Sequence, residues 1–114
     1  MLARTLALIC CLLTCSFAQA QPESVAILQA RAKNYLQAGD FDNAALVLRQ
    51  ALIQSPDDLE LNKDQVLAYT LKRDYARARE TVVALCDLPN ADAICFQLAG
   101  NVFKALEEVK ECEK

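Results

Sequence analysis

The stretch YLQAGDFDNAALVLRQALIQSP, from Tyr35 to Pro56, contains the pattern that decides the fold. It reads as the end of one helix, a turn at Gly39, and a second helix that a serine–proline pair ends. A related stretch, YTLKRDYARARETVVALCDLPN, begins at Tyr69, 34 residues later. A helical unit that repeats at this spacing indicates stacked hairpins, because one unit alone cannot bury its apolar face.

The same spacing reaches a third segment near the C-terminus. Three sets of positions carry it: Leu28, Asn62 and Phe96; Ala32, Val66 and Gly100; and Tyr35, Tyr69 and Phe103. We expect each set to lie where helices touch, so that Gly100 sits at the contact between the last helix and its neighbour.

Five helices follow from the apolar periodicity and the capping residues. Their expected ranges are about 23–37, 41–54, 59–71 and 75–87, with a last helix that starts at 91 or 92. Gly39 and Pro56 end the first two helices, whereas Lys72-Arg73-Asp74 turns the chain without a glycine and is a weaker stop. Alternating runs typical of strands are absent from the sequence. The sequence therefore predicts an all-α domain.

These residues resemble the tetratricopeptide repeat family. The best match is Tyr35 to Pro56, where Ala44, Leu48 and Ala51 follow the turn as small and large residues do in that family. The resemblance implies about two and a half repeats that form a short right-handed solenoid. Repeat 1 would cover about 25–58, repeat 2 about 59–91, and a capping helix about 92–112. Repeat 2 departs from the pattern, since Asn62 holds the usual large aromatic position.

The first 20 residues have the order of a secretory signal peptide. Arg4 precedes an apolar core from Leu6 to Leu13, and the segment ends in Ala18-Gln19-Ala20, a small-x-small cleavage site. The apolar run is shorter than the ~20 residues that span a bilayer. We expect cleavage after Ala20 and a mature domain of residues 21–114. The short leader favours export to a bacterial periplasm over a eukaryotic secretory route.

Lipidation is an alternative interpretation of the leader. Cys10, Cys11 and Cys15 lie in or beside its apolar core. The bacterial lipoprotein signal places a small residue before the modified cysteine, whereas Ile9, Cys10 and Thr14 hold these places. The sequence favours cleavage without lipidation on this ground.

The charge balance disfavours two classes of partner. Without the leader, the chain has 11 basic and 15 acidic residues, a net charge of −4. Nucleic acid requires a clustered positive surface, and an anionic membrane attracts polybasic segments. We expect no nucleic-acid binding, and no membrane insertion after the leader is removed.

No constellation of residues predicts catalysis. The chain has no histidine, and so it lacks the ordinary general base for serine or cysteine nucleophiles. It also has no phosphate-binding glycine loop and no Cys-x-x-Cys or similar metal-ligand spacing. We expect no catalytic residue, no metal site and no cofactor, and hence a protein that is not an enzyme.

Three cysteines remain in the mature chain. Cys95 and Cys112 lie 17 residues apart on one expected helix, roughly 25 Å, which is far beyond the reach of a disulfide. Cys86 and Cys95 flank the Leu88-Pro89-Asn90 turn, and we expect a disulfide between them in an oxidising compartment. Two small buried apolar residues are the alternative. Cys112 would stay free or link two chains.

The resemblance to tetratricopeptide proteins also implies a binding surface, a concave groove lined by the first helix of each hairpin. The corresponding residues are Gln29, Lys33, Leu36, Lys63, Leu67, Thr70, Gln97, Asn101 and Lys104.

The sequence thus favours an exported adaptor or scaffold that holds a protein or peptide partner in this groove, in cell-envelope assembly or secretion. Lys33 and Lys63, expected to be exposed beside Leu36 and Leu67, favour a partner segment with acidic and apolar residues. The alternative is a self-associating structural protein, in which the terminal helix or Cys112 joins two copies.

Overall fold

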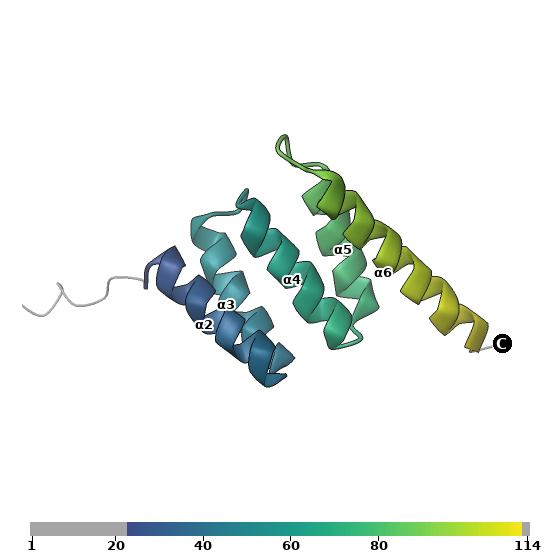
Figure 1. Cartoon of the computed structure of the whole chain (residues 1–114), viewed down its shortest axis with the longest axis horizontal. Coiled ribbons are helices and arrows are strands. Elements are labelled where there is room, and N and C mark those ends of the chain that lie inside the picture. The colour runs from purple at the N-terminus through teal and green to yellow at the C-terminus, as the bar shows by residue number, and fades with distance from the viewer. Residues whose placement is uncertain (1–22, 113–114) are drawn as a thin grey trace, which may run out of the picture.

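In a computed structural model, which describes residues 23–112, the chain forms five helices that follow one another (Figure 1). They are α2 (Val25–Ala38), α3 (Phe41–Gln54), α4 (Leu59–Leu71), α5 (Tyr75–Cys86) and α6 (Ala93–Cys112). The described residues contain no strand, and the predicted all-α class is confirmed. The expected leader and its cleavage site lie outside this range.

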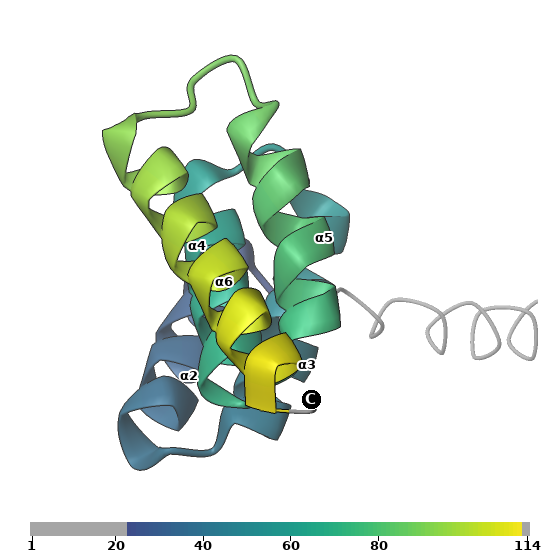
Figure 2. The same ribbon diagram turned by 90° about the vertical axis from the view of Figure 1, so that its right-hand side faces the viewer.

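The helices form two layers. α2, α4 and α6 run side by side in one layer, and α3 and α5 lie behind them in the other (Figure 1). Each helix packs against the next one along the chain, and α4 also contacts α6. Figure 2 looks along this row from its α6 end, with α5 and α6 nearest to the viewer. The fold is therefore a row of helices, in which α2 and α6 are the two ends.

The turns inside the two hairpins have the same geometry, 34 residues apart. Gly39 has a φ of 78° and Arg73 a φ of 65°, both in the left-handed region that favours glycine. Asp40 and Asp74 follow them, and each carboxylate accepts the backbone N–H three residues further on, which caps α3 and α5. Arg73 thus ends α4 with the backbone conformation that Gly39 provides after α2.

Small residues allow the helices of each hairpin to approach closely. Ala32 of α2 and Ala44 and Ala51 of α3 are fully buried, as is Ala78 of α5. Larger apolar side chains fill the space between them. The largest fully buried ones are Leu48, Leu61, Leu85, Val66, Val82, Val102 and Cys95. The core therefore runs along the whole row of helices.

The last helix does not bury the residues that the repeat predicts. Phe96 is 61% exposed and Phe103 41% exposed. Gly100 is exposed as well, and a Cβ atom at this position would meet no atom within 4 Å. The prediction that Gly100 lies at a contact between helices is therefore wrong. The reason is that α3 packs on α2 and α5 packs on α4, whereas no described helix follows α6.

α6 uses a different face to join the row. Cys95 and Val102 are buried, and Leu98, Ala99 and Leu106 pack partly buried against the core. This face lies against α5 and α4. The opposite side of α6 stays open at the end of the row.

Candidate functional site

The nine residues predicted to line a groove lie on α2, α4 and α6, the three helices of one layer (Figure 1). The 34-residue spacing places three of them at equivalent positions on each helix. Five are exposed and form no side-chain hydrogen bond or ion pair within residues 23–112: Lys33, Leu67, Gln97, Asn101 and Lys104. This layer of the fold thus presents side chains that its own packing does not require.

Lys63 differs from the expectation that it is an exposed cation. Its Nζ atom lies 2.9 Å from Asp92 Oδ2 and 3.4 Å from Glu60 Oε1, and its side chain is only 12% exposed. The bond to Asp92 raises the pKa of Lys63, and the same contact lowers the pKa of Asp92. Lys63 therefore ties α4 to the connection between α5 and α6, and its charge is neutralised locally.

The other three half-buried residues also serve the fold in part. The Thr70 hydroxyl donates to the Val66 carbonyl of its own helix at 2.7 Å. Leu36 packs against the core, and Gln29 is half-buried on α2. These three side chains are less exposed than the five named above.

Asp64 of α4 is a charged group that the sequence prediction missed. It is half-buried, and its Oδ2 atom is buried without a hydrogen-bond partner. Desolvation raises the pKa of Asp64, while the positive charge of Lys33 on α2 acts in the opposite direction. The one signal in the sequence is that Asp64 holds the position at which the next repeat places Leu98. Lys33 and Asp64 are thus coupled electrostatically between two helices of the exposed layer.

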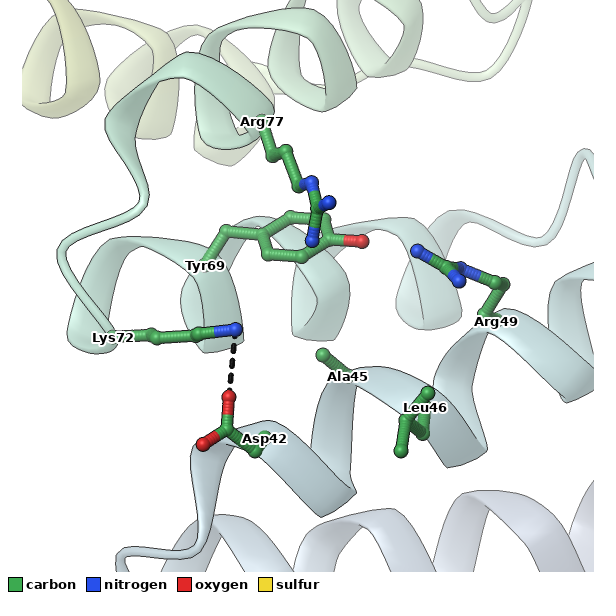
Figure 3. A pocket seen from close by; sticks show the side chains of 7 residues that line it. All are labelled: Asp42, Ala45, Leu46, Arg49, Tyr69, Lys72 and Arg77. Atoms are coloured by element: carbon green, nitrogen blue, oxygen red, sulfur yellow. Dashed lines mark ion pairs between the residues drawn. The ribbon is translucent and has the colours of Figure 1, made fainter.

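A small hollow lies between α3 and α4, beside the start of α5 (Figure 3). Its volume is about 170 Å³, and its lining residues are Asp42, Ala45, Leu46, Arg49, Tyr69, Lys72 and Arg77. Local repeat matching could not predict it, because its walls come from three helices.

Most of the charge in this hollow is paired. Lys72 Nζ lies 2.6 Å from Asp42 Oδ1, and Arg77 Nε lies 3.6 Å from Asp74 Oδ2. Arg49 makes no ion pair with any residue in the range 23–112. The volume is below the roughly 300–1,000 Å³ of common small-molecule sites. The hollow is therefore a weaker candidate site than the exposed layer.

The disulfide expected between Cys86 and Cys95 is not present, and both residues are free thiols. The Cys86 thiol donates to the Cys95 carbonyl at 3.6 Å, and the Cys95 thiol donates to Asp92 Oδ1 at 3.4 Å. Asp92 Oδ1 also accepts the Cys95 backbone N–H at 3.2 Å. The Cys95 side chain thus points to the carboxylate at the start of α6 and not to Cys86. The alternative of two small buried residues holds for Cys95, which is buried, and only in part for Cys86, which is half-buried.

The thiol environment does not favour a reactive cysteine at this turn. Burial raises the pKa of the Cys86 thiol, and the neighbouring Cys95 and Asp87 act in the same direction. A raised pKa leaves less thiolate, which is the nucleophilic form. Cys112, at the end of α6, is exposed.

Three general findings complete the description of the site. Across residues 23–112, no three potential ligands are grouped to hold a metal ion. No helix in that range is long and apolar enough to cross a bilayer. No model of a known protein family matches the chain, and no curated protein matches it at a significant level.

Proposed function

We propose that the chain is a tetratricopeptide-like adaptor that binds an extended protein segment across α2, α4 and α6. The observation that carries this proposal is the set of exposed side chains on these helices, which form no side-chain hydrogen bond or ion pair within residues 23–112. Lys33, Gln97, Asn101 and Lys104 supply hydrogen-bond donors, and Leu67 supplies an exposed apolar contact between them. Such a mixture of a central apolar contact and surrounding polar groups suits a peptide ligand.

The finer fold assignment rests on the repetition within the chain. Two hairpins have equivalent turns, equivalent aspartate caps and one buried alanine at the matching positions 44 and 78. A third copy of the first helix then follows without a described partner helix. This repetition supports a short solenoid of two hairpins and a capping helix.

The charges favour a partner with acidic residues. Lys63 is neutralised by Asp92 and Glu60, so Lys33 and Lys104 are the cations that this layer can offer to a ligand. They lie on the first and last helices of the layer, with Leu67 on the helix between them. A segment that carries carboxylates on both sides of an apolar residue fits this order. The predicted leader supports export, and the partner would then belong to the cell envelope or a secretion system.

Affinity capture from the native compartment tests this function. Two single variants test the surface: Lys33→Glu reverses a charge, and Leu67→Glu replaces the apolar side chain. We expect each of them to reduce capture of the main partner about tenfold, which corresponds to a loss of ~1.4 kcal/mol of binding free energy. Lys63 is left unchanged, since reversing its charge would also break its bond to Asp92. Arg49→Glu is the matched control, because Arg49 is exposed on α3 and forms no ion pair in the described range.

Circular dichroism and size-exclusion chromatography should show that all three variants keep the fold. Undiminished capture by Lys33→Glu and Leu67→Glu, or an equal loss in Arg49→Glu, would contradict binding on the α2–α4–α6 layer.

The predicted leader has its own test. The exported protein should begin at Gln21, and a different first residue in N-terminal sequencing would contradict cleavage after Ala20.

A further inference from the structure

α6 carries an apolar stripe that the described part of the chain leaves exposed. Ala93, Phe96, Gly100 and Phe103 follow one another at spacings of three, four and three residues, and so they share one side of the helix. All four are exposed. The guanidinium carbon of Arg79 on α5 lies 5.9 Å from the centroid of the Phe103 ring. α6 is the last described helix of the row and lies beside α5 (Figure 2).

Gly100 has no role within a single copy. A glycine in a helix interior destabilises the helix relative to alanine. Its φ is not positive, and a Cβ atom would meet nothing within 4 Å. No turn, strain or internal contact in the described chain therefore requires a glycine here. The close approach of a second helix would require one.

The stripe is complementary to itself. We propose that α6 pairs with α6 of a second copy, in antiparallel orientation, across a twofold axis near residue 98. In this register Phe96 lies over Gly100 of the partner subunit, and Phe103 lies over Ala93 of the partner subunit. Each aromatic ring meets a small residue, and the twofold axis repeats both contacts. A parallel pair in register would set ring against ring and leave a gap at Gly100.

The flanking residues agree with this register. Glu107 is the next residue of the stripe, and the axis near residue 98 places it beyond the start of the partner's α6, where its charge stays in water. The two copies of Cys112 come to lie at opposite ends of the pair, roughly 40 Å apart along the helices. The pairing therefore does not use that thiol. The pairing uses Ala93, Phe96, Gly100 and Phe103, and none of these residues is among those proposed to bind a partner segment.

Sedimentation velocity over about a hundredfold range of concentration tests the pairing, because mass action makes the dimer fraction concentration-dependent. The protein expressed from its full chain should double in mass towards the high end of the range. Phe96→Glu and Gly100→Leu should both stay monomeric. Gly100→Leu should keep or raise the melting temperature, since nothing lies near its Cβ position and leucine favours helix.

Ile94→Glu is the matched control. Ile94 is 53% exposed on the same helix but lies two residues from Phe96, on another side. This variant should dimerise like the wild type. A wild type that stays monomeric throughout the range, or a Gly100→Leu variant that dimerises normally, would overturn the proposal.

Cross-linking tests the register. In a Cys112→Ser background, Ala93→Cys combined with Phe103→Cys places two thiols roughly 15 Å apart on one helix, too far to close within a chain. Mild oxidation should link two chains through these positions, and Ala93→Cys alone should not cross-link. Cross-linking through Ala93→Cys alone would indicate a parallel pair and overturn the antiparallel arrangement.

Discussion

Asn62 of α4 and Phe96 of α6 hold equivalent positions in the repeat, yet the asparagine is 9% exposed and the phenylalanine 61%. The Asn62 amide donates to the Pro56 carbonyl at 3.0 Å and to the Asp58 carbonyl at 2.8 Å. It is therefore satisfied inside the turn that precedes α4. α5 covers this side of α4, and no described helix covers the same side of α6. In a row of helices, the presence of a neighbour decides burial more than the polarity of the residue does.

The two ends of the row differ in what they expose. The open side of α2 carries Ile27, Arg31 and Asn34, which are all exposed. Arg31 there pairs with Glu23, at 2.8 Å between Nη2 and Oε2. The open side of α6 carries two aromatic rings and a glycine instead. The α2 end thus resembles an ordinary solvated surface, whereas the α6 end resembles a contact surface.

The largest expected effect compares Tyr69 with Phe103, one repeat apart. Tyr69 is 6% exposed, and its hydroxyl accepts a hydrogen bond from Gln65 Nε2 at 2.9 Å. Tyr69→Ala should lower the free energy of unfolding by about 3–5 kcal/mol, in the range of other buried aromatic truncations. Phe103→Ala should cost less than about 1 kcal/mol in dilute solution, as at most exposed positions. Urea titration of both variants measures the difference.

Protein concentration is the control in this comparison. If α6 pairs with a second copy, the loss caused by Phe103→Ala should grow as the concentration rises, while the loss from Tyr69→Ala should not depend on it in this way. Equal losses in dilute solution would contradict the assignment of α6 as the open end of the row.

The sequence predicted well what depends on local pattern. The bounds of α3 and α4 match their expected ranges, which follow from the apolar periodicity and from stop residues close to each helix end. It failed where the outcome depends on a distant neighbour. The repeat predicts a contact at Gly100, because the spacing alone does not reveal that no described helix follows α6. The sequence predicts an exposed Lys63, because the pattern around Lys63 does not reveal its partner Asp92, which lies 29 residues away in sequence.

The cysteine prediction failed for a related reason. The turn between α5 and α6 does bring Cys86 and Cys95 close together, as their spacing indicated. The direction of the Cys95 side chain is set by Asp92, which accepts both its N–H and its thiol. Sequence spacing predicts the proximity of two backbones, but it does not predict which neighbour a side chain turns to.

A smaller effect is expected at the two hairpin turns, which share one backbone conformation but use different residues to adopt it. Gly39 and Arg73 both have positive φ, which a residue with a Cβ atom adopts at a cost of about 1–2 kcal/mol. Gly39→Ala should therefore destabilise the protein by about 1 kcal/mol, and Arg73→Gly should stabilise it by up to ~1 kcal/mol. Thermal unfolding of both variants checks the two signs. A loss of stability in Arg73→Gly would indicate that the arginine side chain contributes contacts that outweigh its backbone strain.

The smallest effect concerns two carboxylates whose surroundings act in opposite directions. Burial raises the pKa of Asp64 in the folded chain. The folded state therefore binds the proton of this carboxyl group more tightly than the unfolded state does. As a result, the stability of the fold decreases as pH rises above about 4. Asp64→Asn removes this fall and should raise stability at neutral pH by less than about 1 kcal/mol, since the group is only half-buried. Asp92→Asn is the matched control. Its bond to Lys63 lowers the pKa of Asp92, so that its charge stabilises the fold above about pH 4 and this contribution is lost as pH falls through the depressed value. Urea titrations between pH 3 and pH 7 should show that the free energy of unfolding of each variant departs further from the wild-type value as pH rises. The departure should be a gain for Asp64→Asn and a loss for Asp92→Asn. Departures of the same sign would contradict the assigned environments.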